Sequence, residues 1–194
     1  MNPTALTQLV SDVRNELNEK ARATSARFDP SSPVTELLCN RCDAVDKALI
    51  SLWHCCELDE AQASLIAVGG YGRGALFPNS DVDVLILLND EGTAKDSLIS
   101  AFVSSLWDLG LTIGHSVRSI SDCIEMATAD VTVMTTLLET RLLAGDPLLK
   151  DALHNAIDAS DIWPSTTFFN AKIEEQTARY EKFDLTGYLY LMYI

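Results

Sequence analysis

The stretch VGGYGRGALFPNSDVDVLIL, residues 68–87, places a glycine-rich turn about ten residues ahead of two aspartates that one valine separates. Glycines stand at positions 69, 70, 72 and 74. Glycine adopts positive φ angles that other residues avoid, and its missing side chain lets the backbone approach a ligand closely. The apolar run VDVLILL after Asp81 is typical of a buried strand. The stretch therefore predicts a close-contact turn followed by a strand that begins with two carboxylates.

The same turn matches the GxGxxA pattern of dinucleotide-binding folds at Gly70, Gly72 and Ala75. That fingerprint requires a helix that begins within the glycine turn and directs its N-terminus at a pyrophosphate. Here the segment PNS (78–80) follows at once, and the next regular element is the predicted strand. The sequence therefore favours a turn between two strands over a dinucleotide site.

Asp81 and Asp83 are residues i and i+2 of the predicted strand, so their side chains share one face with Cα atoms about 7 Å apart. Two carboxylates this close repel each other, which raises at least one pKa unless a cation lies between them. Magnesium bound by one or two carboxylates and by substrate phosphates is the usual solution, and two such ions stabilise an in-line phosphoryl displacement. An isolated Asp-x-Asp is more often a solvated strand edge or a turn cap. The glycine turn ahead of this one favours a site for metal ions and a triphosphate.

The rest of the chain is predicted to form helices around a few short strands. Two stretches of helical periodicity fill the first 60 residues, and a third, TAKDSLISAFVSSLWDLG, follows the aspartates. Further predicted strands are SLIAV and LTIGHSVRSI, and further predicted helices are DVTVMTTLLETRLLAG (130–145) and WPSTTFFNAKIEEQTARYEKF (163–183). We therefore expect an α/β fold with an N-terminal helical segment (1–60), an α/β core (61–125) and a C-terminal helical segment (126–194).

Charge and hydropathy exclude some classes of partner. The 194 residues include 14 lysines and arginines against 28 aspartates and glutamates, a net charge of -14 that repels a phosphate backbone. A nucleic-acid partner is therefore not expected. No apolar run reaches the ~18 residues of a membrane span, and the N-terminus lacks the pattern of a secretory signal. These features predict a cytoplasmic protein without a membrane partner.

The five cysteines are predicted to be reduced thiols, because their number is odd and their spacing irregular. Cys39 and Cys42 form a CxxC, and His54 with the two cysteines after it adds further possible zinc ligands. Both groups lie in helix-like sequence without a glycine-bearing knuckle, and the CxxC cysteines would face roughly one side of that helix. Small, buried, metal-free cysteines are the favoured interpretation.

VGGYGRGALFPNSDVDVLIL resembles the signature of the polymerase-β-like nucleotidyltransferases, in which a glycine pair precedes an Asp-x-Asp. GGYGRG with PNSDVDVLIL is similar in particular to the N-terminal catalytic domain of the bacterial PII-protein uridylyltransferases. WDLGLTIGHSVRS, LLETRLLAGDP and WPSTTFFNAKIEEQTARY occur in the order that this family uses, so the resemblance covers about residues 60–183. It implies a small mixed sheet with N-terminal and C-terminal helices.

The resemblance also implies an activity, the Mg²⁺-dependent transfer of UMP from UTP to a tyrosine of a PII-type nitrogen regulatory protein. Adenylyl transfer by a related enzyme and a non-catalytic regulatory module that keeps the fold remain open alternatives. The resemblance implies that Gly69, Gly70 and Ser80 contact phosphates and that Arg73 fixes the turn or the nucleotide. The implied site consists of two catalytic, metal-binding aspartates and four nucleotide-binding residues: Asp81 and Asp83, with Gly69, Gly70, Arg73 and Ser80.

Several features depart from the family pattern. The family turn usually continues with glutamate where this chain has Ala75, so a carboxylate that braces Arg73 or the turn is expected to be missing. LTIGHSVRSI offers no third carboxylate, and whether His115 serves the site or only packs stays open. No histidine is followed by aspartate, so a His-Asp site for uridylyl removal is not expected. The chain looks truncated after Tyr180, and its ending GYLYLMYI has the composition of a segment that packs or associates, so weak nucleotide binding and poor transfer are expected.

Overall fold

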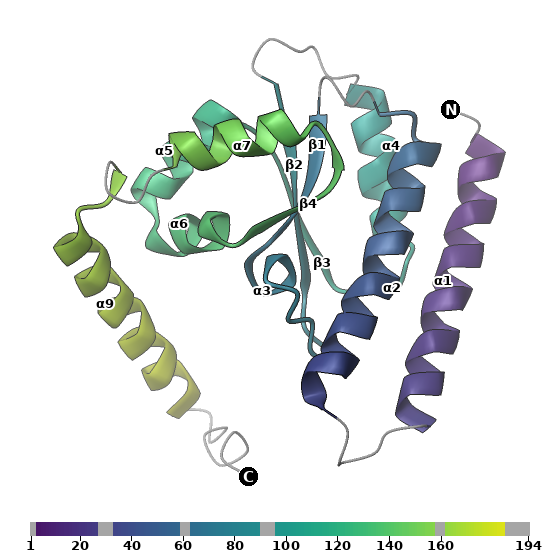
Figure 1. Ribbon diagram of the computed structural model, residues 1–194, viewed down its shortest axis with the longest axis horizontal. Helices are drawn as coiled ribbons and strands as arrows, with labels where there is room; N and C mark the ends of the chain where they lie inside the picture. Colours follow the sequence, from purple (N-terminus) through teal and green to yellow (C-terminus); the bar gives the residue numbers. More distant parts are fainter. Residues whose placement is uncertain (1–2, 27–32, 59–62, 90–95, 158–161, 185–194) are drawn as a thin grey trace.

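The computed structural model describes residues 3–26, 33–58, 63–89, 96–157 and 162–184 (Figure 1). The strands are β1 (Ala63–Val68), β2 (Val82–Leu88), β3 (Ile113–Ser119) and β4 (Thr140–Gly145). The helices are α1 (Pro3–Ala26), α2 (Val34–Cys55), α3 (Gly69–Gly72), α4 (Asp96–Trp107), α5 (Ile120–Ala129), α6 (Val131–Leu138), α7 (Pro147–Ala156) and α9 (Ser165–Asp184). The ending GYLYLMYI lies outside the described residues.

The four strands form one mixed sheet in the order β3-β2-β1-β4. β1 pairs antiparallel with both β2 and β4, whereas β2 pairs parallel with β3. A parallel pair needs a crossover connection, and α4 lies in the connection between β2 and β3. The predicted α/β class is confirmed, and the three strands predicted from the sequence are found as β1, β2 and β3.

Alternate residues of the two central strands contribute to two separate hydrophobic cores. Leu65 and Val84 belong to the core shared with α1, α2 and α4, whereas Ile66 and Leu85 belong to the core shared with α5, α6 and α7. Figure 1 shows these two groups of helices on opposite sides of the sheet. Asp83 is two residues before Leu85, so strand alternation directs its side chain to the face covered by α5, α6 and α7.

The helical layer on the other face is fixed by an apolar stripe along α2. Val45, Leu49, Leu52 and Trp53 recur at helical spacing and are buried. The Trp53 ring meets Phe102 of α4 edge-on, with ring centroids 5.3 Å apart. This packing explains why the predicted N-terminal helices cover the sheet.

The prediction of one long helix over residues 130–145 is wrong in its second half. The helix ends at Leu138, and Thr140–Gly145 form β4 at the edge of the sheet. The leucines and alanine of this segment have good helix propensity, but β1 otherwise lacks a partner on this side, and pairing with it overrides the local preference. Gly145 permits the fit, because a Cβ there would lie 2.5 Å from the carbonyl oxygen of Ala63.

The cysteines differ in exposure. Cys42, Cys56 and Cys123 are buried as predicted, but Cys39 is exposed, so the two cysteines of the CxxC do not share one environment on α2. Burial raises the pKa of the Cys56 thiol to about 11. Within the described ranges, no three His, Cys, Asp or Glu side chains are arranged to hold a metal ion. The absence of bound zinc remains a prediction.

The helices of the described part of the chain include none long and apolar enough to cross a membrane.

Candidate active site

The glycine turn leaves the end of β1 through a single helical turn. Gly69 has a φ of +58°, a conformation that favours glycine, and it opens the short helix α3. Backbone N–H groups of Arg73 and Ala75 donate to the carbonyl oxygens of Gly69 and Gly70, both at 3.0 Å. The turn predicted between two strands is therefore present, although it contains one turn of helix that the sequence analysis did not predict.

A second, tighter turn delivers the chain to β2. The N–H of Ser80 donates to the carbonyl oxygen of Phe77 at 3.0 Å, and Asn79 has a φ of +66°. Proline at the second position and a left-handed asparagine at the third are typical of a type II β-turn. Ser80 and the exposed Asp81 thus come directly before the first residue of the strand.

Asp83 lies one residue inside β2 and is half-buried. Burial raises the pKa of its carboxyl above the ordinary value, and the neighbouring charge of Asp81 raises it further. The predicted repulsion between the two carboxylates is therefore present in the structure. Gly114 of β3 pairs with Asp83 across the sheet, and a Cβ at that position would lie 2.2 Å from Asp83 Oδ1. Any other residue at position 114 would force this carboxylate to shift.

A cavity of about 300 Å³ opens beside Asp83. β3 contributes His115 and Arg118 to its wall, and α6 contributes Thr132 and Thr136. Gly69 does not line the cavity but lies next to one of its lining residues, because a Cβ there would lie 3.6 Å from the Thr136 methyl group. A larger cavity of about 620 Å³ lies between α1, α2 and residues 76–78, away from the aspartates. The smaller cavity is the one lined by Asp83 and by Val68, the residue before the glycine turn.

The remaining predicted residues surround this cavity to different degrees. Asp83 and His115 line it, whereas the other predicted site residues do not: Gly69, Gly70, Arg73, Ser80 and Asp81. The His115 ring lies 6.1 Å from the Trp107 ring, measured between centroids. His115 pairs with Val84, which belongs to the core shared with α1, α2 and α4, so its ring lies on the face of the sheet opposite to that of the Asp83 side chain. This placement favours packing as the role of the ring.

The carboxylate expected to be missing at Ala75 is supplied from another part of the chain. Glu139, between α6 and β4, forms an ion pair with Nη1 of Arg73. This hydrogen bond, followed by the charge of Glu139, raises the pKa of the Arg73 guanidinium. The pair joins residues 66 positions apart in sequence, so no local motif could have predicted it.

Comparison with known proteins agrees with this geometry. The family described as "Nucleotidyltransferase domain" matches residues 52–124, which include the glycine turn, both aspartates and β3. The chain contains a nucleotidyltransferase domain. It is homologous over nearly its whole length to proteins named bifunctional uridylyltransferase/uridylyl-removing enzyme.

The relative from Photobacterium profundum is 43% identical over 189 residues, covering 95% of this chain and 21% of the relative. The one from Cupriavidus pinatubonensis is 46% identical, covering 97% and 21%. The one from Haemophilus influenzae is 43% identical, covering 80% and 18%. The chain thus spans about a fifth of the length of these relatives. A solved structure titled as a toxin-antitoxin with AMP-PNP aligns at a TM-score of 0.33 and 15% identity, over 71% of this chain and 95% of that chain, too low a likeness for any argument.

A buried polar network holds the glycine turn of the nucleotidyltransferase domain from behind. The Tyr71 hydroxyl donates to Asp46 Oδ1 of α2 at 2.5 Å, and Arg141 of β4 donates to both oxygens of the same carboxylate. Arg141 Nη2 also lies 3.3 Å from the Tyr71 carbonyl oxygen, and the guanidinium stands over the Tyr71 ring at 5.3 Å. Burial and the bond to Asp46 raise the Tyr71 pKa, so this hydroxyl stays protonated. The network fixes the turn to two separate elements.

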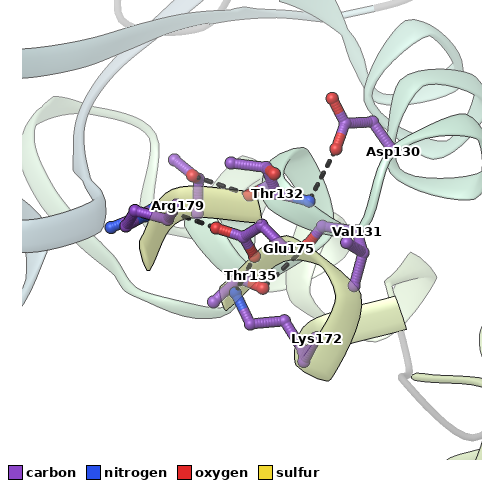
Figure 2. A network of polar contacts seen from close by, with 8 residues as sticks. Asp130, Val131, Thr132, Thr135, Lys172, Glu175 and Arg179 are labelled. Carbon is purple, nitrogen blue, oxygen red and sulfur yellow. Dashed lines mark hydrogen bonds and ion pairs between the residues drawn. The ribbon is translucent and has the colours of Figure 1, made fainter. Parts of the chain in front are cut away.

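The helix α6, which forms one wall of the cavity, is in contact with α9. Figure 2 shows Lys172, Glu175 and Arg179 of α9 lying against α6. Glu175 pairs with both cations, and these partners, Lys172 first, lower its pKa. At the start of α6, Asp130 accepts a hydrogen bond from the N–H of Thr132 at 2.7 Å, which caps the helix.

Proposed function

We propose that the chain transfers UMP from UTP to a tyrosine hydroxyl of a PII-type regulatory protein, with Mg²⁺ as the cofactor. The observation that carries this proposal is the half-buried Asp83, close to the charge of Asp81 and beside the glycine turn, at the wall of a cavity. The uridylyltransferase names of the relatives that match this chain support the choice of nucleotide.

The side chains present fit a magnesium site. Carboxylate oxygens are the ligands that Mg²⁺ prefers, and burial followed by the charge of Asp81 raises the pKa of Asp83. Asp83 Oδ1 lies close against Gly114, where a Cβ would be 2.2 Å from it. When bound at Asp81 and Asp83, Mg²⁺ would offset phosphate charge and favour ionisation of the attacking hydroxyl.

The chain's own residues would orient the two reactants. We assign the triphosphate to Gly69, Gly70 and Ser80, with Arg73 beside them, because the missing side chains at the glycines permit close approach. In the transfer the tyrosine oxygen forms a bond to the α-phosphorus, and the bond from that phosphorus to the bridging oxygen breaks. Pyrophosphate leaves with the electron pair, and the phenolic proton passes to water. The nucleoside would occupy the cavity between β3 and α6.

Transfer of labelled nucleotide tests the proposal. The chain is incubated with Mg²⁺, a PII-type protein and either α-labelled UTP or α-labelled ATP, and label on the acceptor tyrosine is measured. We expect slow labelling from UTP that requires Mg²⁺ and disappears in Asp83→Asn. Labelling from ATP alone would assign the chain to adenylyl transfer. A folded chain that labels no acceptor from either nucleotide would contradict the proposal.

A further inference from the structure

Among the residues that the structure describes, the ion pair between Arg73 and Glu139 is a charged contact made by the glycine turn itself. Arg73 is exposed at the end of α3, with 55% of its side chain accessible, and Glu139 is 27% accessible. An ion pair this exposed contributes little to stability. Its geometry is nevertheless specific, because Glu139 holds one terminal nitrogen of the Arg73 guanidinium and leaves the other available to donate to a second group.

The two terminal nitrogens of Arg73 have different neighbours. Nη1 contacts Glu139, whereas Nη2 lies 3.8 Å from the position that a Cβ on Gly70 would occupy. The guanidinium therefore lies across the surface of the glycine turn, next to a residue that we assign to phosphate contact. A planar guanidinium presents donors in two directions at once, so the nitrogen next to Gly70 can donate to an anion while the other stays with Glu139.

Glu139 is itself held rigidly against the turn. A Cβ on Gly72 would lie 2.0 Å from the Glu139 carbonyl oxygen, so the two backbones are in contact and only glycine fits there. The next residue, Thr140, pairs with Val68 at the end of β1, immediately before the turn. The backbone that carries the Glu139 carboxylate is therefore packed directly against the glycine turn.

From these contacts we infer that Glu139 is a positioning residue that holds Arg73 over Gly70 so that Nη2 meets a polyphosphate. The inference rests on the proposed function and adds a residue to its site. Glu139 acts through Arg73 and does not touch the nucleotide. Charge alone predicts the opposite effect, because a carboxylate near an anionic ligand weakens binding and its removal would strengthen it. Whether removal of the Glu139 charge weakens or strengthens polyphosphate binding therefore decides between a positioning role and simple charge repulsion.

The experiment measures binding of inorganic tripolyphosphate with Mg²⁺ to the whole chain by titration calorimetry. The variants are Glu139→Gln, Arg73→Ala and the double variant, with Glu125→Gln of α5 as an exposed control that loses the same charge. We expect Glu139→Gln to bind about fivefold more weakly and the control to bind like the unchanged protein. In the Arg73→Ala background Glu139→Gln should have no further effect. The melting temperature without ligand should stay within about 2 °C, since the pair is exposed.

Several results would overturn the inference. These are equal or tighter binding by Glu139→Gln, an undiminished effect in the Arg73→Ala background, a large loss of unliganded stability, and no binding of tripolyphosphate by the unchanged protein. The proposed function fails separately. A chain that binds tripolyphosphate with the expected variant pattern but labels no tyrosine from UTP or ATP would remove the transfer activity and leave the role of Glu139 intact.

Discussion

Replacing Asp83 by asparagine should make the protein more stable and inactive at the same time. The substitution keeps the shape of the side chain but removes a half-buried charge whose pKa is raised by burial and by Asp81. Because the carboxylate is still partly in contact with water, screening limits the gain to about 0.5–1 kcal/mol. In a chain of this size that corresponds to a rise in Tm of about 1–4 °C. Loss of a charged metal ligand should lower kcat by about a hundredfold or more.

The pH dependence gives this prediction a sign. Asp83 binds its proton more tightly in the folded chain than in the unfolded one, so its contribution to stability is complete below the ordinary aspartate pKa of 3.8 and is lost as pH rises through the raised value. The difference in Tm between Asp83→Asn and the unchanged protein should therefore be near zero in acid. It should grow as pH rises past the pKa of Asp83 and then stay constant.

Thermal unfolding with EDTA, and again with Mg²⁺ and UTP, measures both effects. Ligand at ten times its dissociation constant stabilises the folded state by about 1.4 kcal/mol, so the unchanged protein should overtake the variant under those conditions. Asp108→Asn, an exposed change of the same kind, is the control. A variant that is less stable than the unchanged protein in EDTA, or that gains equally from Mg²⁺ and UTP, would show that Asp83 is not a strained metal ligand.

Further predictions concern the neighbours of this carboxylate. Gly114→Ala should displace Asp83, since the new Cβ would lie 2.2 Å from its oxygen; transfer should fall at least tenfold, and retained activity would contradict the tight fit. Asp46→Asn should destabilise the fold by about 1–2 kcal/mol in urea unfolding, because Arg141 and Tyr71 lose a charged acceptor, and an unchanged midpoint would count against the network. The purified protein should contain no stoichiometric zinc by elemental analysis; zinc that disappears when both cysteines of the CxxC become serine would show a missed metal site.

The glycine turn and the strand that follows it could be predicted because their signals are local. Positive φ angles at glycines, a Pro-Asn turn and an apolar strand each depend on a few neighbouring residues, and β1, β2 and β3 were found where the sequence predicted them. The carboxylate pair was recognised by its i, i+2 spacing. Burial, and after it the charge of Asp81, raises the pKa of Asp83, as two neighbouring carboxylates without a cation are expected to do. The roles of the individual site residues stay predictions, since their assignment depends on bound ligands.

The parts that could not be predicted are set by contacts between distant residues. The sequence of β4 predicts a helix because its leucines have good helix propensity. The segment forms a strand because it pairs with the edge of β1. Glu139 has no motif of its own, and its meaning comes from Arg73, 66 residues earlier. One signal was available in hindsight. Gly145 follows an apolar segment at the point where backbones meet closely, and a glycine in that position is compatible with a strand end.

The order of strands in the sheet also has a consequence during synthesis on the ribosome. β1 and β2 emerge close together in time, but the other neighbour of β1 is β4, which ends at Gly145. At translation rates of about 5–20 residues per second, the segment from Gly69 to Gly145 takes roughly 4–15 s to appear. For that interval one edge of the most buried strand has no partner and is open to pairing with other chains. The nascent protein therefore carries the complete glycine turn and both aspartates while one edge of β1 is still unpaired. A chaperone that shields β1 would act at this stage.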